Sequence, residues 1–298
     1  MRRAIIDIGT NTAHLLIAEI NKTNEEWFQV IKKKRIYTYL GSFGLDEIHP
    51  EPLSRLRRGL AEFDVLVTDH DVDDVIVLAT EAMRTASNGP TILQSITDTY
   101  SWSPQIIDGL TEARLIATGA MHAVDMTNGD YLVMDIGGGS VEFIHVQNGS
   151  IQSLISTPLG ISRLYDRFHT VDPINASGKN YLKKAVHEEL SKLSITGVKD
   201  LTLVGTAGSF EMFLDKEEIV DNDLLFKNLS AQIITAEAER VAKLGLVERQ
   251  HDPMIEDGRV KYIVVAFLLM EAVIDFFDIR EVTISKYAMK EGAAINPI

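Results

Sequence analysis

The chain has 298 residues, of which 45% are hydrophobic and 24% are charged, a composition typical of a globular protein with one or two domains. Its formal net charge of −14 argues against a nucleic-acid binder, because a phosphate backbone requires a basic surface. The absence of cysteine excludes disulfides and thiolate metal sites. No apolar run reaches the roughly 18 residues that span a bilayer, and we expect no signal peptide, no membrane contact and a cytoplasmic location.

Strand-like runs and helical patterns alternate along the first part of the chain. The strand-like runs predict strands over Arg3–Asp7, Ala13–Ile20, Trp27–Tyr39, Val75–Ala79 and Gln105–Ile107. Apolar residues spaced by three and four positions predict helices over Pro52–Val67, Thr91–Tyr100 and Glu112–Val124.

The second part of the chain begins in the same way. Three strands are expected first and two more later, over Tyr131–Asp135, Val141–Gln147, Ser150–Thr157, Asp200–Val204 and Glu281–Ile284. Before a last short helix, helical patterns cover Ile161–Phe168, Asn175–Leu193, Thr235–Leu244 and Val260–Phe277.

This recurrence indicates an internal duplication. Asp135 follows Asp7 by 128 positions, and superposing the two aligns Ile6-Asp7-Ile8-Gly9 with Met134-Asp135-Ile136-Gly137. Long internal repeats decide the fold of a chain. We therefore predict an α/β protein of two duplicated lobes, residues 1–122 and 123–298. Each lobe would have a mixed sheet of β-β-β-α-β-α type, with a ligand cleft between the lobes.

Each Asp-Ile-Gly places a carboxylate at the end of a strand, before a turn that glycine allows to be sharp. Backbone N–H groups at Gly9 and at Gly137–Gly139 can surround an anion, and Thr10, Thr12 and Ser140 can add hydroxyl donors. The neighbouring Asp can hold Mg²⁺ while substrate phosphates complete the coordination shell. One such turn could equally be an ordinary hairpin, but two copies at matching positions indicate a phosphate site.

A third glycine-rich turn, Val204–Ser209, follows a predicted strand and opens a helical stretch. The N-terminus of a helix favours anions, although an ordinary strand-to-helix turn is equally compatible with this sequence. His14, beside the first turn, is expected to be a packed side chain.

The two Asp-Ile-Gly turns resemble the phosphate loops of the exopolyphosphatase / guanosine pentaphosphate phosphohydrolase family. Three further stretches carry the same resemblance: Ala79–Asn88, Gly109–Leu115 and Gly205–Ser209. That family belongs to the superfamily of actin, hexokinase and the heat-shock-chaperone ATPases. The likeness runs over nearly the whole chain and is specific as an ordered set of motifs. It implies two actin-like (ribonuclease H-like) lobes.

The resemblance also implies roles for individual residues. Glu112 would activate the attacking water, while Asp135 and Glu142 would act in catalysis and bind the metal together with Asp7. The phosphate-binding residues would be Thr10, Asn11, Thr12, Arg84, Gly138, Gly139, Ser140, Gly208 and Ser209.

Taken without the resemblance, three of these positions have plainer interpretations. Thr111 would cap a helix in which the dipole favours Glu112, and Arg84 would be a surface cation near a helix end. Glu142 shares the sheet face of Ser140, which for a glutamate is typical of the solvent-facing side.

The sequence departs from the family pattern near its C-terminus. Lys261 stands where the family more often has an acid, and Ala288 and Lys290 stand where it favours Gly and Arg. These departures affect the assignment of the substrate end of the second lobe more than the assignment of the catalytic centre.

The resemblance implies a Mg²⁺-dependent hydrolase that removes the terminal phosphate from inorganic polyphosphate. Three alternatives stay open: a guanosine pentaphosphate (pppGpp) 5′-phosphohydrolase, an ATP-dependent kinase of small molecules, and a non-enzymatic nucleotide-binding switch. Glu112 argues against the kinase, because kinases of this fold typically use an Asp. The preferred chain length and the formation of a homodimer also stay open.

Overall fold

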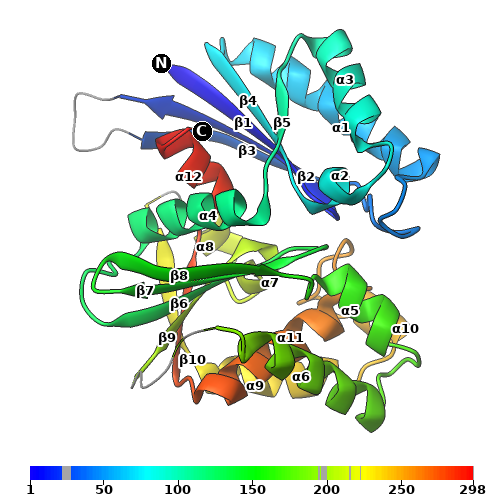
Figure 1. Cartoon of the computed structure of the whole chain (residues 1–298), viewed down its shortest axis with the longest axis vertical. Coiled ribbons are helices and arrows are strands. Elements are labelled where there is room, and N and C mark those ends of the chain that lie inside the picture. Colours follow the sequence, from blue (N-terminus) through cyan, green and yellow to red (C-terminus); the bar gives the residue numbers. More distant parts are fainter. Residues whose placement is uncertain (22–27, 194, 196–199, 215, 222, 298) are drawn as a thin grey trace. The chain divides into compact units, whose positions relative to one another are not determined.

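The computed structural model describes residues 1–21, 28–193, 195, 200–214, 216–221 and 223–297. The chain forms two compact units (Figure 1). Unit 1 comprises Met1–Gly119, Gly137–Gly139 and Met289–Ile298, and unit 2 comprises Ala120–Ile136 and Ser140–Ala288. The predicted lobe boundary between residues 122 and 123 stays a prediction.

Unit 1 is built on a five-stranded mixed sheet of order β3-β2-β1-β4-β5. The β1–β2 and β2–β3 pairs are antiparallel, and β1–β4 and β4–β5 are parallel. All five strands were predicted within two residues over the described part of the chain, whereas the predicted start at Trp27 lies outside the described residues. The strands are β1 (Arg2–Ile8), β2 (Thr12–Ile20), β3 (Phe28–Tyr37), β4 (Asp74–Ala79) and β5 (Pro104–Ile106).

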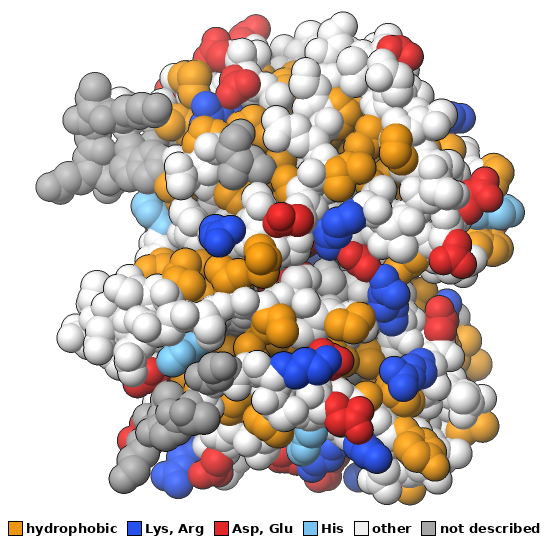
Figure 2. Space-filling model, viewed as in Figure 1, with side chains coloured by type: hydrophobic (Ala, Val, Ile, Leu, Met, Phe, Trp, Pro, Cys, Tyr) orange, Lys and Arg blue, Asp and Glu red, His pale blue; other side chains and the backbone are white. Residues whose placement is uncertain are grey.

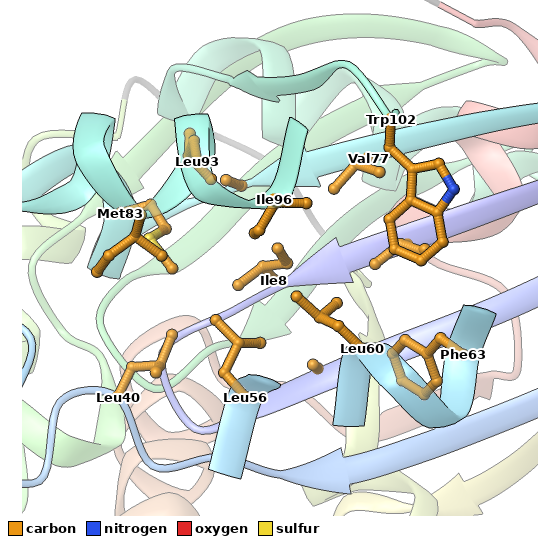
Figure 3. Close-up of a cluster of buried hydrophobic side chains, with 14 of the residues drawn as sticks. Ile8, Leu40, Leu56, Leu60, Phe63, Val77, Met83, Leu93, Ile96 and Trp102 are labelled. Atoms are coloured by element: carbon orange, nitrogen blue, oxygen red, sulfur yellow. The ribbon is translucent and has the colours of Figure 1, made fainter. Parts of the chain in front are cut away.

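One face of this sheet carries the main core of unit 1. Leu56, Leu60 and Phe63 from α1 pack with Ile96 from α3 and with Ile8 of the sheet (Figure 3). The helices of unit 1 are α1 (Pro50–Asp69), α2 (Glu81–Thr85), α3 (Gly89–Tyr100) and α12 (Met289–Ile295), together with most of α4 (Gly109–Ala123). Helix α4 belongs to unit 1 as far as Gly119.

The C-terminal helix α12 packs on β1 and β2 of the same unit. Arg3 donates from Nη1 to the Ala294 carbonyl at 3.1 Å, and Lys33 pairs with Glu291 at 2.8 Å. Side chains alternate between the two faces of a strand. Since Arg3 and Lys33 reach α12, the alternate residues Asp7 and Arg35 belong to that same face.

Unit 2 is built on a six-stranded mixed sheet of order β10-β11-β9-β6-β7-β8. Strands β6–β7, β7–β8 and β10–β11 pair antiparallel, whereas β6–β9 and β9–β11 pair parallel. The strands are β6 (Asp130–Ile136), β7 (Val141–Gln147), β8 (Ser150–Thr157), β9 (Thr202–Thr206), β10 (Phe226–Ser230) and β11 (Glu281–Ser285).

Helix α11 is the centre of the helical layer of unit 2. Eleven of its residues are buried, and it packs against α5, α6, α7 and α9, which explains why its sequence is apolar on nearly all sides. The helices of unit 2 are α5 (Ile161–Phe168), α6 (Ala176–Leu190), α7 (Ala207–Glu211), α8 (Lys216–Val220), α9 (Ala231–Val241), α10 (Leu246–Gln250) and α11 (Ile263–Phe277).

Four short elements were not predicted from the sequence. Helices α2, α8 and α10 have five residues each, too few to establish a helical period. Strand β10 lies at the edge of its sheet, and each of its residues is exposed or half-buried. It therefore lacks the apolar signal of an interior strand.

The strands of the two sheets pair in the same register, so the duplication seen in the sequence is also present in the structure. Asp7 lies opposite His14 and beside Leu78, and Asp135 lies opposite Glu142 and beside Thr206. Each pair of equivalent residues is 128 positions apart. The strand irregularities also correspond, between Ile17 and Ala18 in β2 and between His145 and Val146 in β7. The predicted fold class, α/β with two duplicated mixed sheets, is confirmed.

On the face of the molecule in Figure 2, acidic and basic side chains are interspersed. Within the described ranges, no helix combines the length and apolar character needed to cross a membrane.

Candidate active site

A row of four polar residues crosses the sheet of unit 2 where β6 ends. Thr206, Asp135, Glu142 and Ser156 are neighbours across β9, β6, β7 and β8, so their side chains share one face of the sheet. Thr206 Oγ1 donates to Asp135 Oδ2 at 2.5 Å, and Ser156 Oγ donates to Glu142 Oε1 at 2.7 Å. Each carboxylate is thereby held by a hydroxyl from the next strand.

Glu142 is only 1% exposed, so its expected place on the solvent-facing side of the sheet is wrong. Burying a carboxylate is costly unless hydrogen bonds or a cation compensate it, and a second carboxylate, Asp135, lies directly opposite. The described residues contain no group of three or more His, Cys, Asp or Glu that could hold a metal alone. Mg²⁺ commonly binds through one or two carboxylates and substrate phosphates, and the Asp135–Glu142 pair fits that donor set.

The glycine segment Gly137–Gly139 groups with unit 1 and lies against its first turn. A Cβ on Gly138 would lie 2.8 Å from the side chain of Asn11, and one on Gly139 would lie 2.7 Å from Thr10 Oγ1 and 2.6 Å from Glu81 Cγ. These contacts, and not a left-handed backbone, require glycine here. The structure thus brings together four predicted phosphate-binding residues: Thr10, Asn11, Gly138 and Gly139.

The first turn, between β1 and β2, is held by its own backbone and by the segment after β3. Gly9 N donates to the Thr12 carbonyl at 2.9 Å. The carbonyl of Asn11 accepts from Thr38 N and Tyr39 N at 2.9 and 3.0 Å. Asp7 is the penultimate residue of β1 on one side of the turn, and on the other side Thr12 Oγ1 lies 2.9 Å from His14 Nε2.

Arg84, at the end of α2, lies between two acids of unit 1. Its guanidinium pairs with Glu81 Oε2 at 2.7 Å, lies 3.7 Å from Glu112 Oε2, and donates to the Ile107 carbonyl. The Arg84 side chain is 23% exposed and that of Glu112 is 12% exposed, so Arg84 is not the surface cation that its local sequence suggests. Glu81 was missed, although its i, i+3 spacing to Arg84 is a helical pairing signal.

Glu112 lies in the first turn of α4. The prediction that Thr111 caps this helix is wrong, because α4 begins at Gly109 and Asp108 accepts from Thr111 N at 2.7 Å. Hydrogen bonds from Thr111 hold the pKa of Asp108 below its ordinary value. Asp108 therefore fixes the helical turn that carries Glu112.

The third glycine-rich turn joins β9 to α7 and contacts an arginine that sequence reasoning missed. A Cβ on Gly208 would lie 2.1 Å from Arg259 Nη2, so the guanidinium packs directly on this glycine. Arg259 also pairs with Glu256 at 2.9 Å and lies 4.0 Å from Glu211. Ser209 is 4% exposed. Arg259 lies 51 positions from Gly208, and no local pattern joins the two.

The residues that depart from the family pattern have separate surroundings. Lys261 Nζ lies over the rings of Tyr165 and Tyr262, at 5.0 and 4.7 Å from their centroids, a cation–π arrangement. Ala288 is 8% exposed, and Lys290 lies in α12 of unit 1.

Two sheets that share the order of five strands, each with an Asp-Ile-Gly turn at the same register, define a duplicated α/β protein. A model of the Ppx/GppA phosphatase family matches residues 16–296, and the chain belongs to this family. It is accordingly a phosphatase-family hydrolase, as predicted.

Similar proteins include an exopolyphosphatase from Cytophaga hutchinsonii, whose crystal structure matches with a TM-score of 0.88 at 29% identity. The match covers 99% of this chain and 97% of the Cytophaga hutchinsonii chain. A bifunctional 3-dehydroquinate synthase/phosphatase from Fusobacterium nucleatum is 26% identical over 99% of this chain. A guanosine-5′-triphosphate,3′-diphosphate pyrophosphatase from Aliivibrio fischeri is 24% identical over 97% of this chain. The chain spans only 46% and 58% of the length of these last two relatives.

Proposed function

We propose that this chain is an exopolyphosphatase that releases the terminal phosphate of inorganic polyphosphate. The observation that carries the proposal is the Arg84–Glu112 pair, in which an arginine and a largely buried glutamate lie 3.7 Å apart. Arginine offers a planar fork suited to phosphate, and an adjacent ionised glutamate is a suitable acceptor for the proton of an attacking water.

In the proposed reaction, water attacks the terminal phosphorus and the anhydride P–O bond to the next phosphate breaks. The products are orthophosphate and a chain shortened by one unit, and Glu112 accepts a proton of the water. Arg84 and the donors of the glycine segment offset the charge of the phosphoryl oxygens. Asp135 and Glu142, with Asp7 as a further carboxylate, would hold Mg²⁺, which when bound supplies additional charge neutralisation.

A second candidate, phosphohydrolysis of guanosine pentaphosphate, is favoured by the Aliivibrio fischeri relative. The chemistry at the terminal phosphate is the same, and the difference lies beyond the phosphates. The exopolyphosphatase function is preferred because the match to the Cytophaga hutchinsonii protein covers nearly the full length of both chains.

Phosphate release from polyphosphate, pppGpp and ATP, measured in parallel with Mg²⁺, tests the proposal. Glu112→Gln should lower kcat on polyphosphate by roughly 10²- to 10⁴-fold while binding is retained. Glu51→Gln, in the exposed pair with Arg55, is the matched control and should keep wild-type rates.

An active Glu112→Gln enzyme would refute the assigned base. Faster release from pppGpp than from polyphosphate would favour the second candidate, and transfer of phosphate from ATP to an acceptor would favour a kinase.

A further inference from the structure

Thr12 and His14 form a side-chain pair at the mouth of the first turn. Both belong to β2, two positions apart, so their side chains share one face of the sheet. Thr12 Oγ1 lies 2.9 Å from His14 Nε2, and both residues are half-buried. The proposed function places the phosphoryl oxygens at the glycine segment, which lies against this turn through Asn11 and Thr10, and it assigns no role to His14.

The chemistry of the pair depends on which atom donates. The threonine hydroxyl has one proton, whereas a phosphate oxygen can only accept. If Thr12 donates to His14, the hydroxyl turns its lone pairs toward an anion, which is unfavourable. If His14 Nε2–H donates to Thr12, the hydroxyl proton is left to donate to the phosphate.

We infer that His14 is a positioning residue, which donates from Nε2 to Thr12 and so holds the Thr12 hydroxyl as a donor to a substrate phosphate. This inference rests on the proposed function. A neutral imidazole can carry its proton on Nε2, so the arrangement requires only that tautomer.

The duplicated register supports this role. The residue equivalent to His14 in unit 2 is Glu142, which accepts a hydrogen bond from Ser156. A carboxylate can only accept, which suits a cation, whereas an imidazole N–H can donate, which suits an anion. On β3, the neighbour of His14 is Arg35, a second donor group on the same face.

A double-mutant cycle on the full chain tests the inference. Thr12→Val removes the hydroxyl at nearly constant shape, His14→Leu removes the donor, and His14→Gln keeps an N–H donor near the position of Nε2. A hydrogen bond to a charged group is worth about a tenfold to hundredfold change in affinity. We expect Thr12→Val and His14→Leu each to raise KM for polyphosphate by roughly tenfold, with kcat changed less than about threefold and unchanged thermal unfolding.

Because His14 acts through Thr12, the double variant should be no worse than the worse single variant, and His14→Gln should recover most of the lost affinity. Multiplying effects in the double variant, or a His14→Leu enzyme with wild-type KM, would overturn the inference. So would a His14→Gln enzyme as impaired as His14→Leu.

Wild type, Thr12→Val, His14→Leu and the double variant should also be titrated with tripolyphosphate without turnover. If wild type binds tripolyphosphate but releases no phosphate, the proposed function fails, and the Kd values still decide the Thr12–His14 coupling. Additive Kd effects would overturn the inference independently of catalysis.

Discussion

The two Asp-Ile-Gly turns have the same backbone and different chemistry. At the end of β6, the row Thr206–Asp135–Glu142–Ser156 consists of two carboxylates, each held by a hydroxyl. The equivalent row of unit 1 is Leu78, Asp7, His14 and Arg35.

One carboxylate is common to both rows, and the other positions have diverged. The unit 2 row offers oxygen acceptors, as a hard cation requires. Beside Asp7, which the proposed function assigns to the metal, the unit 1 row offers imidazole and guanidinium groups, which can donate to an anion. We propose that the duplicated backbone supplies two sites of different ligand preference, because the side chains differ at three register positions.

The largest expected effect comes from the second carboxylate of the unit 2 row. Glu142→Gln keeps the shape but removes the charge that would hold Mg²⁺. We predict that kcat for phosphate release falls at least about 100-fold. Glu281→Gln, an exposed glutamate in β11 of the same sheet, is the control. Near-normal activity of the Glu142 variant would refute a metal-binding role for this row.

Removing the Thr206 hydroxyl, which donates to Asp135, should have a smaller effect on activity than Glu142→Gln. Thr206→Val removes the 2.5 Å hydrogen bond to Asp135 Oδ2 and leaves the packing volume nearly unchanged. Outer partners of metal ligands typically contribute about 10- to 100-fold to metal affinity, so the Mg²⁺ concentration for half-maximal activity should rise by about tenfold. Thr202→Val, at the start of the same strand, should leave that concentration unchanged; an equal shift would show a general effect on β9.

The glycines of the two turns provide a third comparison. A Cβ on Gly139 would overlap Glu81 Cγ at 2.6 Å and Thr10 Oγ1 at 2.7 Å, whereas on Gly9 its nearest neighbour is the Thr12 carbonyl at 3.2 Å. Gly139→Ala should destabilise the protein by about 1–3 kcal/mol, and Gly9→Ala by less, in denaturant unfolding. The reverse order would contradict the close approach of the glycine segment to the first turn.

The smallest effect concerns pH and distinguishes the two units. In unit 2, burial lowers the pKa of His169 below its ordinary value, with Arg249 acting in the same direction and Asp172 opposing it. Burial likewise lowers the pKa of His122. The unfolded chain takes up these protons at about pH 6.5 while the folded chain resists them, so stability is lost as pH falls below that value.

Hydrogen exchange followed by mass spectrometry at pH 7.5 and 5.5, corrected for the intrinsic exchange rate, checks this prediction. Peptides of unit 2 should lose protection on acidification more than peptides of unit 1, and His169→Gln should reduce the difference. Equal loss in both units would contradict it.

Much of the fold was predictable because the duplication repeats a pattern that sequence alone displays. The period-two strands around Asp7 and Asp135 fixed the turn positions, and the register of β1–β2 and β6–β7 followed from the short turns between them. Thr10, Asn11, Gly138 and Gly139 lie together in the structure, and their role in phosphate binding stays a prediction.

The missed features depend on contacts that are distant along the chain. Thr206 reaches Asp135 only through the parallel β6–β9 pairing, and Arg259 packs on Gly208 from the segment before α11. No periodicity encodes such contacts. The Asp108 cap is different, because an Asp directly before the helix is a recognisable start signal that the Thr111 assignment overlooked.

The claim that the two turns serve opposite ligands is tested most directly by titrating Mg²⁺ and polyphosphate in parallel. Phosphate release would be measured for wild type, Glu142→Gln and His14→Leu. We predict that Glu142→Gln raises the Mg²⁺ concentration for half-maximal activity with little change in KM for polyphosphate. His14→Leu should instead raise KM for polyphosphate with little change in that Mg²⁺ concentration. If both variants shifted the same parameter equally, the division of roles between the two turns would be wrong.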